Sequence, residues 1–313
     1  MDPLGRTNES RTNEIFDQFG PIPRLCIDYQ IDPEAMDLYE RELNTAISET
    51  TSAKLETLIK TASSANLGAD SVSHKIALLN RQLSDKVRSQ GVVIPITPYI
   101  QSRLSNRFRD LGRREHLRLY EAFANVPEGR RMAGVFFEAL AQRALQVGIT
   151  LELVPMVKLD RAPRGLPQWH SSHEFLANLQ LEQRRQDALI GRFNIDIKPI
   201  RTEEFSNKKP LSLARDVMYV PEAKNQEALD SFIWLDEGLF ILQFTIAETH
   251  DIKQGLLDFF RKYVVSFPPL SSWNFLFIIE PNQILKCPQP RDATLRSLAM
   301  YSAVLDVAGL SVV

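Results

Sequence analysis

Two apolar runs on either side of a short acidic turn limit what this chain can fold into. The runs are Leu229–Leu235 and Leu239–Ala247, and Asp236-Glu237-Gly238 lies between them. Glycine supplies the positive φ that tight hairpin loops require, so the pattern predicts a β-hairpin. Strands this apolar need cover from other elements, which indicates a sheet packed beneath helices.

The hairpin also predicts which side chains share a face. With a two-residue loop, Asp230 falls opposite Gln243 or Thr245. Cross-strand partners share a face, and so do residues two apart on one strand, so these three side chains are expected on the same face. A three-residue loop or a bulge would break this arrangement. The opposite face is expected to be apolar and to hold Ser231, Ile233, Leu235, Phe240, Leu242, Phe244 and Ile246. A plainer alternative is a buried hairpin in which Asp230 caps a neighbouring backbone.

Composition places the chain among ordinary globular proteins. Its 313 residues are enough for two domains, at about 150 residues per domain. The apolar fraction of 44% and the charged fraction of 24% are typical of such proteins. A net charge of -2 argues against a uniformly basic nucleic-acid binder.

Cysteine usage and the amino terminus suggest an intracellular protein, with the nucleus as one destination. Cys26 and Cys287 are too few for a disulfide framework, and neither belongs to a C-x-x-C zinc motif. The first residues, MDPLGRTNESRTNE, lack the apolar core of a secretory signal. No apolar run approaches the roughly 20 residues that cross a bilayer, so no membrane partner is expected.

The amino-terminal part of the chain is expected to be mostly helical. Residues 1–20 are polar and are predicted to form a disordered lead. Asp32-Pro33-Glu34 predicts a helix start, and apolar residues at near-helical spacing continue towards residue 90. Prolines then indicate a short extended piece at 91–98. We therefore expect a helical segment over residues 21–118.

Residues 119–313 are predicted to form an α/β domain with a mixed sheet. A helix at about 130–147 should end at Gly148 and lead into a strand at Ile149–Val157. The polar range 160–210, weakly helical near 175–189, is expected to be an insertion. A helix is expected at about His250–Val264. Further strands are predicted at Asp216–Val220 and Trp273–Ile279, whereas periodicity leaves Leu295–Val307 open between helix and strand.

A dense run of arginines is a candidate contact for DNA. Between Gln101 and Arg118 the chain carries Arg103, Arg107, Arg109, Arg113, Arg114 and Arg118. We take Arg107, Arg109, Arg113 and Arg114 as candidates for binding phosphates. The alternative is a solvated helix face with ion pairs along the helix.

Other motifs are weak or absent. His170 and His173 have the H-x-x-H spacing of zinc ligands, but no cysteine lies nearby, so a structural or solvated pair is the better interpretation. No glycine is followed by lysine, which excludes the Walker phosphate loop. Nucleotide binding is therefore not expected.

The last part of the chain resembles a known family. The residues that carry the resemblance begin at Leu119 and include LYEAFANVPEGRRMAGVFFEALAQ, LELVPM, VMYVPEAKNQEALDSFI and LQFTIAETHDIKQGL. They are similar to the carboxy-terminal module of fungal Crinkler proteins, which is related to trypanosome retrotransposon-hot-spot proteins. The resemblance covers roughly the last 195 residues and implies a restriction-endonuclease-like fold. In full-length relatives an NTPase module often precedes the nuclease. Here FGPIPRLCIDY and the helices after it look similar to the end of such a module, without its nucleotide loop.

The resemblance also implies a set of site residues. In that nuclease superfamily a helix gives a Glu, one strand gives an Asp, and the next strand gives Glu or Gln. Carried over residue by residue, these positions are Glu138, Asp230 and Gln243. Such oxygen donors suit Mg²⁺, which polarises a phosphate and lowers the pKa of an attacking water. Glu138 alone has the plainer alternative of facing solvent or pairing with Arg143.

The chain departs from the family pattern at one position. Two residues after the Glu or Gln, the superfamily has a Lys that steadies the hydroxide or the phosphate, and here this position is Thr245. Lys253 is expected to take that part from the following helix. His250 at i and Lys253 at i+3 would then share a helix face. The alternatives are a solvated Lys253 and a His250 that only caps the helix start.

Two functions follow from the resemblance. One is an effector-like intracellular protein that cleaves DNA with Mg²⁺, with protein partners bound through the helical segment. The other is a catalytically silent DNA-binding or protein-interaction module of the same fold. A third interpretation, an unrelated helical scaffold with an α/β domain, fits the composition alone.

Overall fold

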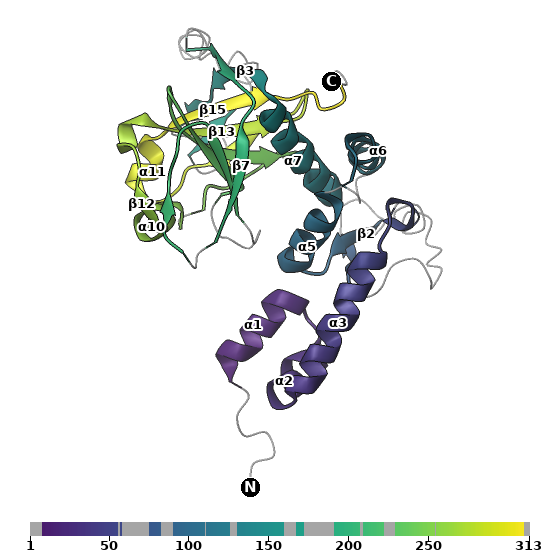
Figure 1. Cartoon of the computed structure of the whole chain (residues 1–313). Coiled ribbons are helices and arrows are strands. Elements are labelled where there is room, and N and C mark those ends of the chain that lie inside the picture. The colour runs from purple at the N-terminus through teal and green to yellow at the C-terminus, as the bar shows by residue number, and fades with distance from the viewer. Residues whose placement is uncertain are drawn as a thin grey trace. The chain divides into compact units, whose positions relative to one another are not determined.

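We describe the chain from a computed structural model of all 313 residues (Figure 1). The structure describes residues 8–55, 57, 75–82, 90–109, 111–125, 130–159, 167–171, 191–206, 209–221, 229–253 and 255–309. The chain divides into two compact units, Met1–Phe136 and Phe137–Val313.

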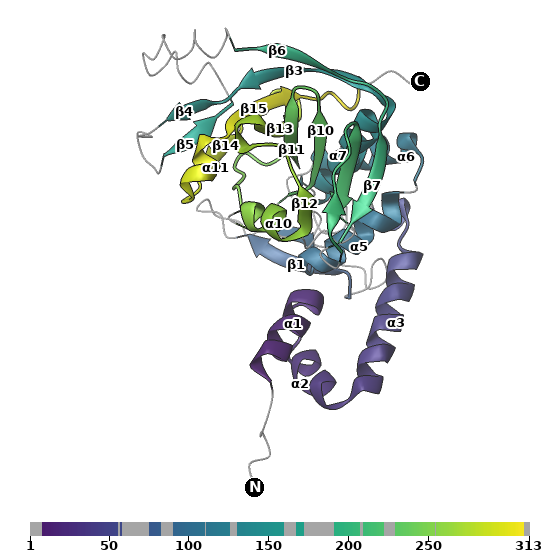
Figure 2. The same ribbon diagram turned by 60° about the vertical axis from the view of Figure 1, so that its left-hand side comes forward.

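The second unit is built on an eight-stranded mixed sheet (Figure 2). Its strand order is β6-β3-β15-β13-β11-β10-β9-β7. The strands are β3 (Ile149–Pro155), β6 (Phe193–Ile197), β7 (Arg201–Phe205), β9 (Val217–Pro221), β10 (Ser231–Leu235), β11 (Gly238–Thr245), β13 (Trp273–Ile279) and β15 (Ala299–Val304). β11, β13 and β15 are parallel, and β10 and β3 run antiparallel to their neighbours. The predicted fold class, an α/β domain with a mixed sheet after a mostly helical segment, is confirmed.

Smaller elements complete this unit. A three-stranded sheet contains β4 (Val157–Leu159), β5 (Gln168–His170) and β14 (Lys286–Pro288). A two-stranded ribbon pairs β8 (Leu211–Ser212) with β12 (Val264–Ser266). Among the residues that the structure describes, the helices of this unit are the part of α7 (Arg130–Val147) after Phe136, α10 (Leu256–Tyr263), the 3₁₀ turn η2 (Leu270–Ser272) and α11 (Ala293–Ser297). The end of the chain that periodicity left open thus contains both a short helix and a strand.

The large sheet has to curl, because consecutive strands form its two edges. β6 ends at Ile197 and β7 begins at Arg201, so only three residues join the opposite edges. Eight strands laid flat would span roughly 34 Å at about 4.8 Å per strand, whereas this link reaches about 14 Å. β3 and β6 accordingly arch over the other strands (Figure 2). The end of α7 lies at this link, where the Ile200 N–H donates to the Gln146 carbonyl at 3.2 Å.

The range 160–210 differs from the insertion that we expected. Both edge strands of the main sheet, β6 and β7, come from it. Edge strands are half exposed and carry polar residues, such as Asn194 and Asp196, so the sequence of this range resembles a loop. The expected weak helix at 175–189 lies outside the described residues.

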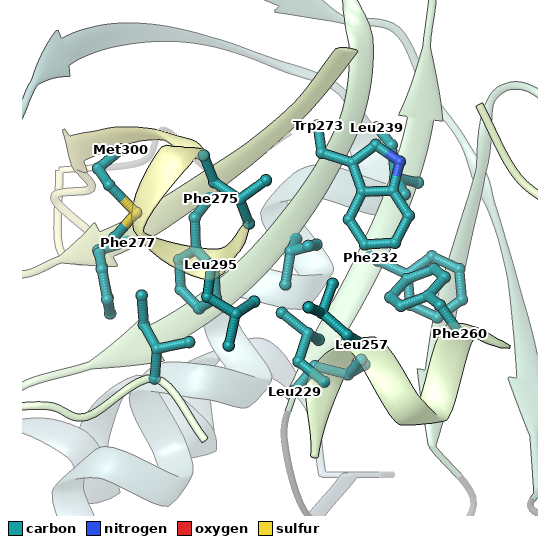
Figure 3. Packing of buried hydrophobic residues seen from close by; sticks show 14 of the residues in the cluster. Leu229, Phe232, Leu239, Leu257, Phe260, Trp273, Phe275, Phe277, Leu295 and Met300 are labelled. Carbon is teal, nitrogen blue, oxygen red and sulfur yellow. The ribbon is translucent and has the colours of Figure 1, made fainter. Parts of the chain in front are cut away.

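One face of the large sheet carries an aromatic core (Figure 3). The Phe260 ring of α10 lies 4.5 Å from Trp273 and 5.1 Å from Phe232, measured between ring centroids. Leu256 and Leu257 of the same helix are buried in this cluster. In Figures 1 and 2 the sheet separates α10 from α7. Burial of the apolar stripe of α10 therefore holds this helix, the next one in the chain after the hairpin, against the face of the sheet that carries the aromatic core.

The first unit is mostly helical, as predicted. In the described part of this unit the elements are α1 (Glu9–Phe19), α2 (Pro23–Ile31), α3 (Pro33–Glu49), β1 (Ala77–Gln82), β2 (Gln90–Pro95), α5 (Pro98–Arg109), α6 (Arg113–Ala124) and the first turns of α7. α3 begins where its cap predicted, because the Asp32 carboxylate accepts from the backbone N–H groups of Glu34 and Ala35. Phe136 of α7 packs 5.6 Å from Phe108 and 5.5 Å from Phe123.

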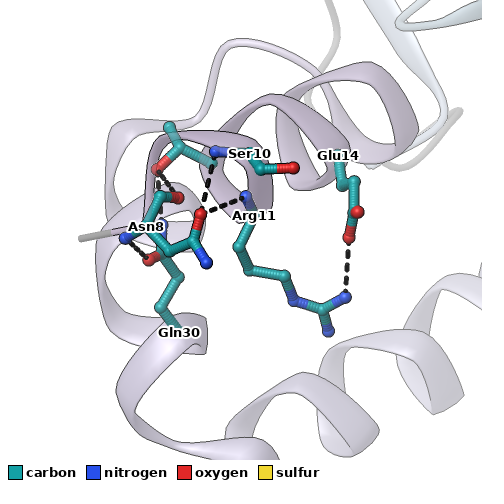
Figure 4. Close-up of polar contacts among 6 residues, drawn as sticks. Asn8, Ser10, Arg11, Glu14 and Gln30 are labelled. Carbon is teal, nitrogen blue, oxygen red and sulfur yellow. Dashed lines mark hydrogen bonds and ion pairs between the residues drawn. The ribbon is translucent and has the colours of Figure 1, made fainter. Parts of the chain in front are cut away.

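Two segments of the first unit differ from the expectation. A helix, α1, stands within the range predicted as a disordered lead, and residues 1–7 lie outside the described residues. The Asn8 side chain caps it by accepting from Ser10 and Arg11 N–H (Figure 4), while Ile15 and Phe19 bury one stripe. Residues 77–82, expected to continue a helix, form β1 and pair with β2. That pairing is non-local, so local spacing did not reveal it.

Candidate functional site

The hairpin forms as the sequence predicts, with a two-residue loop. Leu235 pairs with Gly238, so Asp236 and Glu237 form the turn. Gly238 has φ 142°, and a Cβ at this position would lie 2.3 Å from the Ser272 carbonyl oxygen. Only glycine combines this backbone angle with such a close approach.

The register brings Asp230 and Gln243 together. Ser231 pairs with Leu242, which places the preceding Asp230 opposite Gln243. The Gln243 amide Nε2 donates to Asp230 Oδ2 at 2.5 Å, and the Phe244 backbone N–H donates to the same oxygen at 2.9 Å. Gln243 is only 7% exposed. The predicted pairing of Asp230 with Gln243 is therefore confirmed. The plainer alternative, in which Asp230 caps a neighbouring backbone, also describes its bond to the Phe244 N–H.

Both faces of the hairpin are buried. The seven residues expected on the apolar face are all buried, as predicted. Phe232, Leu239 and Ile241 occupy the same face as Gln243 and belong to the aromatic core beneath α10. The acid and the amide therefore lie at the end of a hydrophobic core, where the low dielectric strengthens their hydrogen bonds.

The position at which the family pattern has a lysine is occupied here by a buried, hydrogen-bonded threonine. Thr245 is 5% exposed, and its Oγ1 accepts from the Ala247 backbone N–H at 3.0 Å. This local turn uses the hydroxyl to stop the strand. A short neutral side chain thus ends β11 where a cation was expected.

His250 and Lys253 do not share a helix face, so that prediction is wrong. α10 begins only at Leu256, after Gly255, and both residues precede it. Thr249 forms a bridge to Lys286, and the His250 N–H donates to the Lys286 carbonyl at 3.1 Å. This pairing holds the backbone extended and delays the helix.

His250 nevertheless lies on the same side of the sheet as Gln243. Its ring meets the Phe277 ring edge to face at 6.0 Å, and Phe277 is the register partner of Gln243 on β13. Burial lowers the pKa of His250 below its usual value of 6.5, and the Lys253 charge also lowers it, while Asp251 raises it. Its imidazole is therefore neutral at pH 7, whereas Lys253 is exposed.

Glu138 lies on α7, on the other side of the sheet from α10. It is half-buried, and Oε1 accepts from Gln142 Nε2 at 3.1 Å, one turn further along the helix. Asp230 and Gln243 share their face with the residues that pack under α10, and the sheet separates that face from α7. The expected convergence of Glu138 with the other two residues does not follow from this arrangement. Within the described residues, no group of three or more His, Cys, Asp or Glu side chains could hold a metal ion.

Two of the arginines in the basic run connect helices of the first unit. Arg107 Nη2 donates to the Ser48 carbonyl at 3.3 Å, and Arg103 bonds Asn44. Both contacts join α5 to α3. Arg113 is half-buried and Arg114 is exposed, whereas the side chain of Arg109 lies outside the described residues.

The histidine pair is not on one helix. His170 belongs to β5, is buried, and pairs in register with Lys286 and Val157. His173 lies outside the described residues. A zinc pair on one helical face is therefore wrong for His170.

The loop after β13 supplies a residue that the sequence did not single out. Gln283 donates from Nε2 to the Ala247 carbonyl and accepts at Oε1 from the Glu280 N–H. Pro281-Asn282 marks a turn, and Asn282 takes φ 63°, a value that asparagine tolerates. The sequence indicates the turn, but it does not indicate that Gln283 bonds the backbone just after β11.

Comparison with known proteins assigns no family to the chain. No family model, no curated protein and no solved structure matches it. In the described parts of the chain, every helix is too short or too polar to cross a membrane.

Proposed function

We propose that the second unit is a restriction-endonuclease-like domain that cleaves DNA phosphodiesters with Mg²⁺, centred on Asp230 and Gln243. The hydrogen-bonded pair of these two residues carries the proposal. It joins an acid and an amide from the two strands of one hairpin, followed by a helix and then by the parallel strand β13. The pattern implied by the Crinkler resemblance likewise has an acid on one strand and a Glu or Gln on the next.

The pair fits a magnesium ion in the chemistry of its atoms. Asp230 and Gln243 already lie within hydrogen-bond distance of each other, so the Asp230 carboxylate and Gln243 Oε1 would be the oxygen ligands of a cation bound at this pair. Mg²⁺ commonly takes one or two protein oxygens and fills its other positions with water and substrate phosphate. When bound, it would polarise the phosphate and lower the pKa of the attacking water. Glu138 bonds Gln142 on its own helix and is not used in this proposal.

His250 has the properties of the proton acceptor for such a reaction. Burial keeps its ring neutral at pH 7, and the ring lies beside Phe277 on the face that carries Gln243. A neutral imidazole can take a proton from water as DNA is cleaved. Lys253, three residues further on and exposed, supplies a positive charge to the phosphate backbone.

Two observations favour a second function, a catalytically silent DNA-binding module. Asp230 already stabilises the fold by accepting the Phe244 N–H, and Thr245 is closed against Ala247. In this function the exposed Arg114 and Arg107 would contact phosphates without any cleavage.

Plasmid nicking in Mg²⁺ separates the two functions. Asp230→Asn and His250→Ala are compared with Glu237→Gln, a control on the exposed turn of the same hairpin. We expect nicking by the wild type and the control, and a loss of roughly 100-fold or more in the other two variants. Equal nicking by all four proteins would exclude this site. DNA binding without nicking, weakened by salt and by Arg114→Gln, would support the silent module.

A further inference from the structure

The segment after the hairpin is tied by its backbone to a distant loop. This post-hairpin segment, residues 246–253, contains His250 and Lys253. The Lys286 N–H donates to the Glu248 carbonyl at 2.8 Å, and the His250 N–H donates to the Lys286 carbonyl at 3.1 Å. The position of the His250 ring therefore depends on where the loop 280–287 lies.

One side chain fixes that loop to the end of the hairpin. The ladder between β11 and β13 stops at the pair Thr245 and Ile279. Beyond it, Gln283 donates from Nε2 to the Ala247 carbonyl and accepts at Oε1 from the Glu280 N–H, at 3.2 Å. The Gln283 amide thus replaces the next rung of the ladder, with one donor and one acceptor.

We propose that Gln283 is a positioning residue that holds the post-hairpin segment so that His250 stays against Phe277, beside Gln243. Its effect on cleavage rests on the proposed nuclease function. Only an amide of this length meets both partners. A glutamate can accept from Glu280 N–H, but it has no proton for the Ala247 carbonyl. We call these two hydrogen bonds of the Gln283 amide the clamp. Gln283→Glu should lose the bond to the Ala247 carbonyl, and Gln283→Ala should lose both bonds.

Hydrogen exchange tests the clamp without relying on activity. The full chain is compared as wild type, Gln283→Ala, Gln283→Glu and Ile284→Ala, the last being a control at an exposed position of the same loop. In Gln283→Ala we expect the His250 amide to exchange roughly tenfold faster, since the variant loses both hydrogen bonds of the Gln283 amide. Gln283→Glu should fall between, while the control and the amides of β13 stay unchanged. Unchanged exchange at His250 in Gln283→Ala would overturn the clamp.

Cleavage kinetics then test positioning as distinct from folding. A displaced His250 slows the chemical step, so Gln283→Ala should lower kcat about tenfold with KM unchanged. Faster exchange with unaltered kcat in a cleaving enzyme would overturn the positioning role. If the wild type itself does not cleave DNA, the nuclease function fails, and the exchange result still decides whether the clamp exists.

Discussion

Asp230 shows how one residue can serve both the fold and a candidate site. Its Oδ2 accepts from Gln243 Nε2 and from the Phe244 N–H, a backbone group buried at the end of β11. A carboxylate that satisfies a buried N–H is structural even in a working nuclease. Loss of activity in an Asp230 variant therefore has to be interpreted together with its stability.

Graded substitutions of Asp230 measure its structural share. Asp230→Ala leaves the Phe244 N–H without this acceptor and should lower the free energy of unfolding by about 1–3 kcal/mol. Asp230→Asn keeps a carbonyl oxygen and should lose less. Urea unfolding at pH 7 gives these values, with Asp236→Ala on the exposed turn as a control that changes by about 0.5 kcal/mol or less. Equal losses in Asp230→Ala and the control would show that the cap is not formed.

Because the thiol of Cys287 is buried, we expect the stability of the second unit to depend on pH in the alkaline range. Burial, together with the smaller effect of the Asp251 charge, raises the pKa of its thiol from 9.0 to about 12. Because the folded pKa is the higher one, the stabilisation is fully present below pH 9.0 and is lost as pH rises towards about 12. The free energy of unfolding of the wild type, relative to Cys287→Ala, should therefore fall as the pH rises from about 9 towards 12. A difference that is constant across this range would contradict the burial of the thiol.

At the scale of elements, the hairpin depends on Gly238. Its φ of 142° is unfavourable for other residues, and an added Cβ would meet the backbone oxygen of Ser272 at 2.3 Å. The angle belongs to the local hairpin turn, whereas the contact comes from Ser272, which directly precedes β13 and is distant in sequence. The glycine thus fixes the turn and the approach of a third strand together.

Gly238→Ala should destabilise the protein by roughly 2–4 kcal/mol, because strain at this φ adds to the clash with Ser272. Thermal unfolding followed by circular dichroism measures the loss. Glu237→Ala, one residue earlier on the exposed turn, serves as the control and should have little effect. An unaltered melting temperature in Gly238→Ala would mean that β11 and β13 do not meet as described.

At the scale of the second unit, the curl of the sheet controls how the edges behave. β11 is buried at every position and is paired on both sides, whereas β6 has one partner and exposes Phe193, Asn194 and Asp196. The short link between β6 and β7 brings the two edges towards each other. In the strand order, however, β6 and β7 are not hydrogen-bonded to each other.

Native-state hydrogen exchange checks this arrangement. Amides of β11 and β13 should be the slowest in the second unit, and those of β6 should exchange roughly 100-fold faster, because edge strands open without global unfolding. Equal protection of β6 and β11 would instead indicate that β6 and β7 are hydrogen-bonded and that the sheet closes into a barrel.

The sequence alone determined the features that depend on near neighbours. The acidic turn and Gly238 predicted the two-residue hairpin, and parity then placed Asp230 opposite Gln243. Asp32 and Pro33 predicted the start of α3. These features were readable because turn chemistry and the two-residue period of a strand act over a few residues.

Only the tertiary structure decided what depends on distant partners. Lys286 holds the backbone near His250 extended, so the helix begins later than its pattern suggests. The edge strands β6 and β7 came from a range that looks like a loop. In each case a non-local pairing outweighed local propensity, since burial and sheet hydrogen bonds contribute more free energy than the preference of a few residues.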